Sequence, residues 1–299
     1  MNAENQTENN AADVRANLAE VAPDAEAALK PGSVAHQALT YLRTMEARDL
    51  DAAKAMLAPG FHMVFPGDCH FDSLEGLIAY GKGRQGTALK TIDRFDETEA
   101  ADGTVVYVWG TLYGKKIDMQ TDYRDIRFVD RFCMKDGKFV SQMVWNDMGE
   151  HGFGPGDRPI PPNPPSRGDE TAQGAASKFV LGYLRTMEAR DLDAARAMLG
   201  PGFHTIFMGG HRFTTPEELV AFQKGRQQNT WKAFQRFDEI EAADGTVVFC
   251  FGTLQGEKMD GTPYQNIRYI DRFTVRDGKS VDQMVWNDMA EHGFARTKV

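Results

Sequence analysis

The spacing of apolar residues predicts that each half of the chain starts with helices. From residue 33 to residue 48, apolar side chains recur at the intervals of one helix face. These residues are Ala38, Tyr41, Leu42 and Met45. Asp49 then provides an N-cap for a second short helix, from 50 to 57, which we expect Pro59-Gly60 to end.

Alternating apolar and polar residues predict strands in the segment that follows. Residues 61–65 have the pattern of a first strand, and Ser73 caps a third helix up to residue 81. Longer strands are expected at about 91–100, 104–113, 122–134 and 138–147, with Asp-Gly hairpin turns at 102–103 and 136–137. Helices followed by a run of antiparallel strands indicate an α+β fold.

The whole pattern occurs twice. The segment from Tyr41 to Asp51 recurs letter for letter from Tyr183 to Asp193, and residues 144–148 match residues 285–289. A period this long is that of a domain, not of a solenoid repeat. We therefore predict a tandem duplication, with domains at 33–153 and 175–294 and a short tail at 295–299.

The remaining segments differ in composition from the two copies. Residues 1–32 are polar, acidic and rich in alanine, so we expect them to be disordered or to carry a loosely attached helix from Val14 to Leu29. Residues 154–174 form a linker whose first part contains six prolines, which favours an extended spacer. Such a spacer can cross a small domain, and we expect the copies to pack as an intrachain pseudo-dimer.

Composition narrows the classes of partner. The chain of 299 residues has 34 basic and 43 acidic side chains, a net charge of −9, which argues against a nucleic-acid surface. We find no apolar run of membrane-spanning length and no secretory signal in the opening residues. Three widely spaced cysteines suit reduced thiols, so we expect a cytoplasmic protein. From its charge and its apolar runs we expect it to bind neither nucleic acid nor membrane.

Asp130 has the most unusual predicted environment. Alternation along its strand places it on one face with large apolar side chains: Ile126, Phe128 and Phe132. A carboxyl among such neighbours is expected to lose solvation, which raises its pKa and suits it to donate or transfer protons. The alternative is a structural role, in which Asp130 pairs with a neighbouring arginine.

Several motifs together resemble those of one family. A strand contains Asp-Arg-Phe, an Asp-Gly-Lys turn follows, and the last strand ends near Trp-Asn-Asp, in both copies. This order resembles the SnoaL-like branch of the nuclear transport factor 2-like superfamily. The resemblance implies a cone-shaped, curved antiparallel sheet with helices on its concave face. Members include ketosteroid isomerase, polyketide cyclases, dehydratases and binding domains, so the fold alone does not fix the function.

Ketosteroid isomerase offers a closer comparison. Its helical tyrosine and its strand aspartic acid form an oxyanion hole. Here Tyr41 with Asp130, and Tyr183 with Asp271, stand at the matching positions. The resemblance therefore implies that these four residues are catalytic. The base of the isomerase has no counterpart, because phenylalanine (Phe65 and Phe207) replaces it in both copies.

The resemblance also implies a pocket lining. The expected ligand-contacting residues are Phe65, Trp109, Phe128, Asn146, Phe207, Phe251 and Asn287. Alternation on the last strand leaves two possibilities: Asp130 lies beside Met143 and Trp145, or, after a bulge, beside Gln142, Val144 and Asn146. The family pattern favours the second. Asn146 and Asn287 would then bond a polar ligand group or, alternatively, a nearby strand end.

Other candidates are weaker. His62 and His204 are possible bases, although alternation turns them away from the apolar face. Arg84 and Arg226 would clamp a carboxylate at the pocket mouth, or would simply lie at a solvated helix end. The repeated acidic residues and histidine after the last strand, at 147–151 and 288–292, lack metal-ligand spacing. We predict no metal and no cofactor.

These features favour a small-molecule enzyme. We expect an isomerase, dehydratase or cyclase that acts on a small, partly apolar carbonyl compound. A non-catalytic binding or accessory protein is the alternative, favoured by the missing base. The copies differ near the pocket, for example at Pro66 and Met208, so two sites of unequal specificity are expected.

Overall fold

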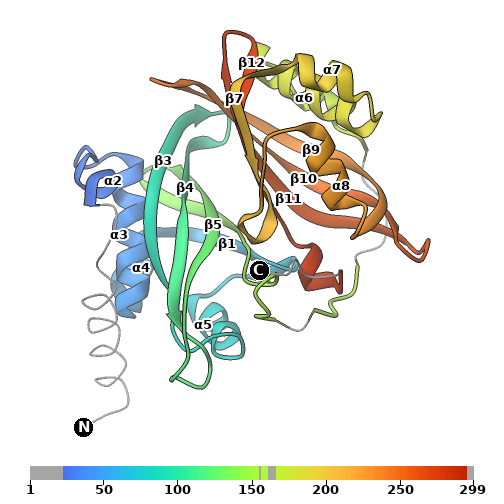
Figure 1. Cartoon of the computed structure of the whole chain (residues 1–299). Coiled ribbons are helices and arrows are strands. Elements are labelled where there is room, and N and C mark those ends of the chain that lie inside the picture. The colour runs from blue at the N-terminus through green and yellow to red at the C-terminus, as the bar shows by residue number, and fades with distance from the viewer. Residues whose placement is uncertain (1–22, 155, 161–165, 295–299) are drawn as a thin grey trace. The chain divides into compact units, whose positions relative to one another are not determined.

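The computed structural model describes residues 23–154, 156–160 and 166–294 (Figure 1). The chain divides into two compact units. The first ends at Val144 and excludes Pro66–Asp68, and the second contains Pro66–Asp68 and continues from Trp145. Each unit holds one six-stranded sheet with its helices. The α+β duplication predicted from the repeat is therefore confirmed.

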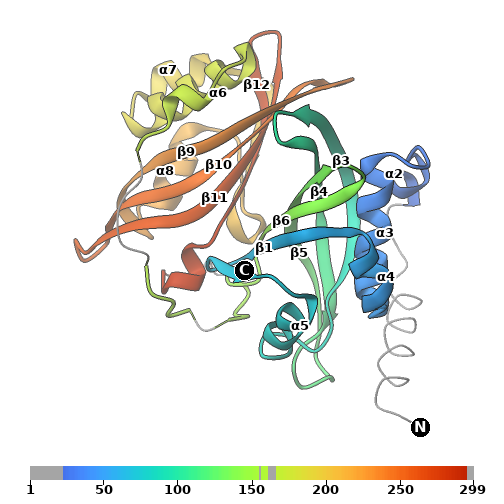
Figure 2. The same ribbon diagram turned by 180° about the vertical axis from the view of Figure 1, so that it is seen from behind.

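The first copy follows the predicted order of elements. Its elements are α2 (Pro23–Ala27), α3 (Val34–Ala47), α4 (Leu50–Ala55), β1 (Leu57–Phe65), β2 (Cys69–Phe71), α5 (Leu74–Lys82), β3 (Leu89–Ala100), β4 (Gly103–Lys115), β5 (Asp122–Lys135) and β6 (Lys138–Asn146). Helix α3 packs on β3 and β4 (Figures 1 and 2).

The second copy repeats this arrangement. Its elements are the short helix η1 (Asp169–Thr171), α6 (Ala175–Glu188), α7 (Leu192–Ala197), β7 (Leu199–Ile206), η2 (Met208–Gly210), β8 (Arg212–Phe213), α8 (Pro216–Gln223), β9 (Gln227–Ala242), β10 (Gly245–Lys258), β11 (Pro263–Arg276), β12 (Lys279–Asn287) and η3 (Met289–His292). Helix α6 packs on β9 and β10.

The sheets are mixed, not purely antiparallel as we expected. The strand orders are β2-β1-β6-β5-β4-β3 and β8-β7-β12-β11-β10-β9. The pairs β1–β6 and β7–β12 are parallel, and the other pairings described are antiparallel. The reason is the connection, because a helix and four strands separate β1 from β6 along the chain. Neither sheet closes into a barrel.

Local sequence signals explain the helix starts. Asp49 accepts a hydrogen bond from the backbone N–H of Ala52, and Ser73 accepts one from Gly76, as capping predicts. Pro59-Gly60 does not end a helix. It lies inside β1, where Gly60 has φ of 76° and the pairing shifts before His62. The dipeptide forms a bulge because glycine tolerates positive φ.

Glycine also permits the bend of each sheet. A Cβ on Gly110 would lie 2.1 Å from the carbonyl oxygen of Thr91, where the pairing of β3 with β4 shifts. A Cβ on Gly252 would lie 2.0 Å from that of Ala233. Only glycine allows the two backbones to approach this closely, and both copies keep glycine at this position.

The leader and linker are described only in part. Within the predicted segment Val14 to Leu29, helix α2 is described, and its Glu26 pairs with Arg43 on α3. Part of the predicted linker is packed, since the carbonyl of Arg167 accepts a hydrogen bond of 2.9 Å from Phe234 of β9. Residues 1–22, 155, 161–165 and the tail at 295–299 lie outside the described residues.

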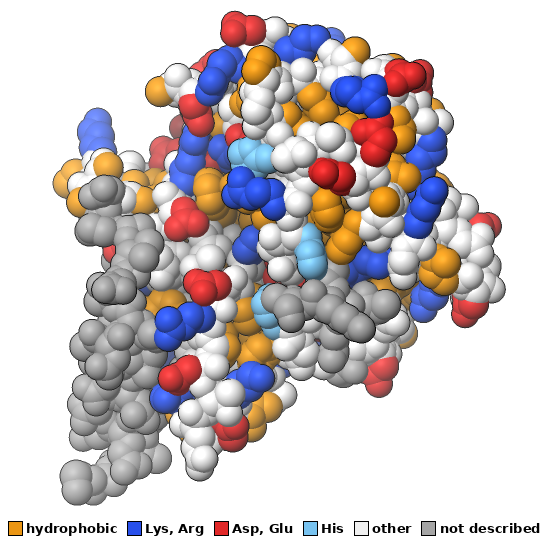
Figure 3. Space-filling model, viewed as in Figure 1, with side chains coloured by type: hydrophobic (Ala, Val, Ile, Leu, Met, Phe, Trp, Pro, Cys, Tyr) orange, Lys and Arg blue, Asp and Glu red, His pale blue; other side chains and the backbone are white. Residues whose placement is uncertain are grey.

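Charged side chains of both signs are interspersed on the face drawn in Figure 3. Among the residues that the structure describes, we find no helix both long enough and apolar enough to cross a membrane. All three cysteines are free thiols, and Cys133 and Cys250 are buried.

Candidate active site

Asp130 lies on the helix-facing side of β5 and is completely buried. Its predicted neighbours share this face: the ring of Phe132 packs edge-on against Tyr41 of α3, 5.7 Å between centroids. Phe128 is also buried there. The alternation in the sequence therefore placed the carboxyl correctly between the sheet and the first helix.

Two side chains hold one oxygen of this carboxyl. The ammonium of Lys90, from β3, donates to Oδ2 at 2.7 Å, and the amide of Gln142, from β6, donates to the same oxygen at 3.3 Å. The ammonium also lies 3.8 Å from the centre of the Phe128 ring. Charged partners of this kind favour an ionised carboxylate.

The other polar atoms of the cluster have no hydrogen-bond partner. Oδ1 of Asp130, Oε1 of Gln142 and the hydroxyl of Tyr41 are all buried and unpaired. Such atoms are rare in folded proteins because each costs solvation energy that nothing replaces. Three together mark the place where a ligand would supply the missing bonds.

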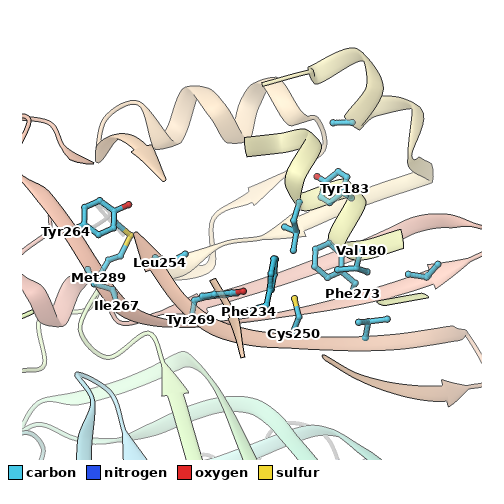
Figure 4. Close-up of a cluster of buried hydrophobic side chains, with 14 of the residues drawn as sticks. Val180, Tyr183, Phe234, Cys250, Leu254, Tyr264, Ile267, Tyr269, Phe273 and Met289 are labelled. Carbon is cyan, nitrogen blue, oxygen red and sulfur yellow. The ribbon is translucent and has the colours of Figure 1, made fainter. Parts of the chain in front are cut away.

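The second copy builds the same cluster. Lys232 of β9 donates to Oδ2 of Asp271 at 2.5 Å, and Gln283 of β12 donates to that oxygen at 3.4 Å. Oδ1 of Asp271 and Oε1 of Gln283 are again buried and unpaired. Tyr183 comes from α6, and its ring lies 5.9 Å from that of Phe273 (Figure 4). The duplication has kept the polar cluster as well as the fold.

A cavity reaches this second cluster. Its volume is about 70 Å³, which limits it to a small ligand. Tyr183, Phe207, Lys232 and Gln283 line it together with Leu184, Met187, Glu188, Arg190, Leu219, Gln223 and Thr230. The cavity thus combines an apolar wall with the ends of the polar cluster.

Burial sets the proton affinities of the cluster. Loss of solvation raises the pKa of Asp130 and of Asp271, and the neighbouring ammonium groups of Lys90 and Lys232 oppose this shift. Burial, and then the nearby carboxylate, raises the pKa of the Tyr41 hydroxyl well above its usual 10. The tyrosine therefore remains a neutral hydrogen-bond donor across the range in which the aspartate titrates.

The register of the last strand settles which of its residues face the pocket. In the second copy the turn is two residues long, at 277–278, and a separate bulge at Val281 of β12 lies opposite Thr274 and Val275 of β11. As a result Val285 is opposite Asp271 and Gln283 is opposite Phe273. The prediction that relied on a bulge is confirmed.

The register places Trp109 and Phe251 elsewhere. Val108 is the residue of β4 opposite Asp130, and Trp109 is opposite Val129. Phe251 is likewise opposite Ile270 instead of Asp271. Residues directly opposite each other share a face, so both aromatic rings point away from the pocket. The prediction that they line it is wrong.

The other predicted aromatic residues have different surroundings in the two copies. Phe207 lines the cavity, and the equivalent Phe65 packs its ring against Phe71. Phe128 lies under the Lys90 ammonium. In the second copy the equivalent of Phe128 is Tyr269, whose buried hydroxyl is unpaired.

The two histidines lie on the opposite face of the sheet. His62 is paired with Ser141 in register, whereas its neighbour Met63 pairs with Gln142 of the pocket face. Its ring contacts Asp72 at 2.9 Å and His70 at 2.8 Å near the surface. His204 likewise pairs with Asp282. A role as the base of this pocket is therefore contradicted for both.

Asn146 and Asn287 bond the chain that follows their strands. Their side-chain oxygens accept hydrogen bonds from the backbone N–H groups of Met148 and Met289, at 3.1 and 3.0 Å. The amide of Asn287 also contacts the sulfur of Met208 at 3.0 Å. The alternative that we kept for these residues, a bond near the strand end, is the arrangement found.

The repeated arginines are buried, so a solvated helix end is wrong for both. Arg84 donates to the Tyr80 hydroxyl at 2.7 Å. Arg226 donates to both oxygens of the buried Glu150, at 2.7 and 3.2 Å. Its guanidinium thus already holds a carboxylate of the chain itself.

Acidic residues after the last strands also pair with arginine. Asp288 lies 3.2 Å from Arg268, and Glu291 lies 3.5 Å from Arg158. Within residues 23–154, 156–160 and 166–294, no group of three or more histidine, cysteine or acidic side chains is placed to hold a metal ion.

Lys90 and Lys232 were not among the site residues predicted from the sequence. A signal was present, because the lysine is retained while its neighbours change from Leu89-Lys90-Thr91 to Trp231-Lys232-Ala233. Gln142 was predicted only as a neighbour of Asp130 on the last strand. Polar residues kept amid changed apolar ones would have pointed to both positions.

Comparisons with known proteins agree with this fold. The sequence profile of the SnoaL-like domain matches residues 38–142 and 180–283, which is more than half of the chain. No curated protein matches the chain.

Solved structures similar to one repeat include three bacterial proteins. An NTF2-like protein of unknown function from Burkholderia pseudomallei is 16% identical, with 40% of this chain and 95% of that chain covered and a TM-score of 0.33. A protein of ketosteroid isomerase-like fold from Catenulispora acidiphila, in complex with trimethylamine, is 12% identical over 39% and 86%, with a TM-score of 0.32. A proposed polyketide cyclase from Pseudomonas putida is 19% identical over 38% and 91%, with a TM-score of 0.29. Through its two profile matches, the chain belongs to the SnoaL-like domain family.

Proposed function

We propose that the protein is an enzyme that moves protons on a small carbonyl compound, as an isomerase, dehydratase or cyclase without a cofactor. The observation that carries the proposal is the pair of unpaired oxygens, Oδ1 of Asp130 and of Asp271, each buried beside a tyrosine. A folded protein keeps such atoms unpaired at a cost in stability, which a functional role explains.

The aspartates act as the bases. The resemblance implied a neutral aspartic acid that donates to an oxyanion, but a lysine ammonium at 2.7 Å favours the ionised form of Asp130. Burial raises the pKa of this carboxylate, which makes it a stronger base than an exposed aspartate. This assignment supplies the base that the isomerase comparison lacked.

Each tyrosine stabilises the charge that forms. Oδ1 removes a proton from the carbon beside the carbonyl, the electrons of that C–H bond form a C=C bond, and the carbonyl oxygen becomes an enolate. Tyr41 or Tyr183 donates a hydrogen bond to this oxygen. The protonated aspartate then returns the proton to another carbon, to a departing hydroxyl, or to an alkoxide formed by ring closure.

Replacing both bases tests the proposal. Asp130→Asn with Asp271→Asn should lower the turnover of a true substrate at least tenfold, because asparagine cannot accept the proton. Substrates can be found by thermal-shift screening of small carbonyl compounds, followed by a proton-exchange assay in deuterated water.

The same measurement separates the enzyme from its alternative. Asp118→Asn, in an exposed turn of the first copy, is a suitable control and should leave turnover unchanged. Compounds that bind to the parent chain and to the double asparagine variant, but never exchange a proton or react, would favour a non-catalytic binding protein.

A further inference from the structure

We propose that Lys90 and Lys232 are catalytic residues that pair first with the aspartate and then with the enolate, so that the site takes acidic carbonyl compounds and enols. This inference rests on the proposed function and adds a residue and a substrate class to it. Each ammonium forms an ion pair with the buried carboxylate of its own copy, Lys90 with Asp130 and Lys232 with Asp271.

The backbone of each lysine is fixed by a matching ion pair on the helix. Glu46 accepts from the Lys90 N–H at 2.8 Å, and Arg43 donates to the Lys90 carbonyl at 3.0 Å. The two side chains also pair with each other at 2.9 Å. The lysine is thus held on both sides of its peptide unit by one turn of α3.

The second copy has the same brace, by which we mean a helix ion pair that bonds both the backbone N–H and the carbonyl of the lysine. Glu188 accepts from the Lys232 N–H at 2.7 Å, Arg185 donates to the Lys232 carbonyl at 2.9 Å, and the pair is closed at 2.8 Å. A structural lysine at a strand edge needs no such device. A brace retained in both copies fits a side chain whose position matters to the chemistry.

The ammonium joins the carboxylate to the cavity. Lys232 lines the cavity and donates to Oδ2 of Asp271, whose side chain has no exposed surface. Of the other charged groups at the cavity, Glu188 is neutralised by Arg185 and Arg167, and Arg190 lies at the exposed end of α6. The charge that an incoming group meets first is therefore positive.

Charge balance explains the arrangement. Before reaction, the ammonium compensates the carboxylate. When a substrate proton moves to Oδ1, the aspartate becomes neutral and the substrate oxygen becomes negative, so the ammonium is left to compensate the enolate. The buried site carries no net charge at either stage, which avoids the cost of an isolated buried charge. A more acidic substrate transfers its proton to the aspartate more completely, so the ammonium pairs more fully with the enolate.

A coloured phenol tests the exchange without a known substrate. 4-Nitrophenol is an enol analogue whose absorbance distinguishes phenol from phenolate. We expect the full-length chain to bind it as the phenolate. Lys90→Met with Lys232→Met should weaken phenolate binding at least tenfold, whereas Lys90→Arg with Lys232→Arg should retain part of it. Lys178→Met, on the exposed face of α6, is the control.

The aspartate variants should act in the opposite direction. Asp130→Asn with Asp271→Asn removes the competing carboxylate and frees the ammonium, so phenolate should bind at least tenfold more tightly. The proposal is overturned if the methionine variants bind phenolate as well as the parent chain. It is also overturned if the asparagine variants bind no phenolate or bind it more weakly. Unchanged turnover in the asparagine variants would instead remove the proposed function and leave this binding role standing.

Discussion

Two buried tyrosines of the first copy differ in one contact. The Tyr123 hydroxyl donates to the carbonyl of Thr87 at 2.7 Å, whereas the Tyr41 hydroxyl has no partner. Both rings are packed in the interior. The unpaired hydroxyl has lost its solvation without gaining a bond, so it contributes nothing to stability and is available to a ligand.

This difference predicts opposite effects of the same substitution. Tyr41→Phe should leave the free energy of unfolding unchanged or raise it by up to about 1 kcal/mol, because an unpaired hydroxyl is removed. Tyr123→Phe should lower it by about 1 kcal/mol, because a made bond is lost. Urea unfolding of both variants measures the difference. An equal loss in the two variants would mean that Tyr41 has a structural partner in solution.

The pH dependence of stability follows from the buried carboxylates. Their pKa is raised in the folded state, so between the ordinary value of 3.8 and the raised value the folded chain binds more protons than the unfolded chain. Stability should therefore fall as pH rises through this window. Unfolding curves of the parent chain and of Asp130→Asn with Asp271→Asn should diverge there, and parallel curves would contradict the burial argument.

At the residue scale the sequence predicted the pair of tyrosine and aspartate but not their partners. Asp130 was identified because alternation surrounds it with apolar residues. Lys90 sits on a different strand and reaches the carboxyl by its long side chain, which the pattern of its own strand does not reveal and only the comparison of the two copies indicates. The prediction for Trp109 was wrong for a different reason. The register of β4 against β5 decides which face its ring lies on, and that register cannot be read from either strand alone.

At the scale of elements, Gly110 marks a close approach of two strand backbones in the first copy. Gly110→Ala should destabilise the first unit by about 3 kcal/mol or more, because its Cβ would meet the Thr91 carbonyl at 2.1 Å and backbone cannot move aside as a side chain can. Gly83→Ala is the matched control, since the nearest atom to its Cβ lies at 3.6 Å. Thermal unfolding should separate the two, and a stable Gly110→Ala chain would show that the sheet can flatten here.

Most elements could be predicted, and each exception has an identifiable physical cause. Caps such as Asp49 and Ser73 act within a few residues, so their helices began where expected. Pro59-Gly60 was misinterpreted because the same dipeptide ends helices and makes bulges, and only the pairing of β1 with β6 selects the bulge. Strand β2 has three residues, too few for an alternation to be visible.

At the scale of the whole molecule, duplication has produced two clusters with different surroundings. The cavity of the second copy is lined by Gln223 and Thr230, where the first copy has Gly81 and Ala88. Tyr269 replaces Phe128 beneath the lysine. The second pocket therefore offers more hydrogen-bonding groups, and we expect it to prefer the more polar ligand.

Titration calorimetry with 4-nitrophenol can resolve binding at the cluster of each copy. We expect a binding curve with two classes of site, of which Lys90→Met removes one and Lys232→Met the other. Tyr269→Phe should weaken only the class that Lys232→Met removes, by about 1 kcal/mol, the value of a single hydrogen bond. One class of site, unaffected by which lysine is changed, would contradict two independent pockets.

The bulge beside Val281 has a consequence for how this family diversifies. It sets the phase of the last strand, so that Gln283 and Val285 face the pocket and Met284 and Trp286 face away. Losing that one residue would reverse the two faces of the strand. The amide of Gln283 and the aliphatic side chain of Val285 would then be replaced in the pocket by the thioether of Met284 and the indole of Trp286. Substitutions adjust such a pocket gradually, but the presence of one extra residue at this bulge selects which of two complete sets of side chains the ligand meets.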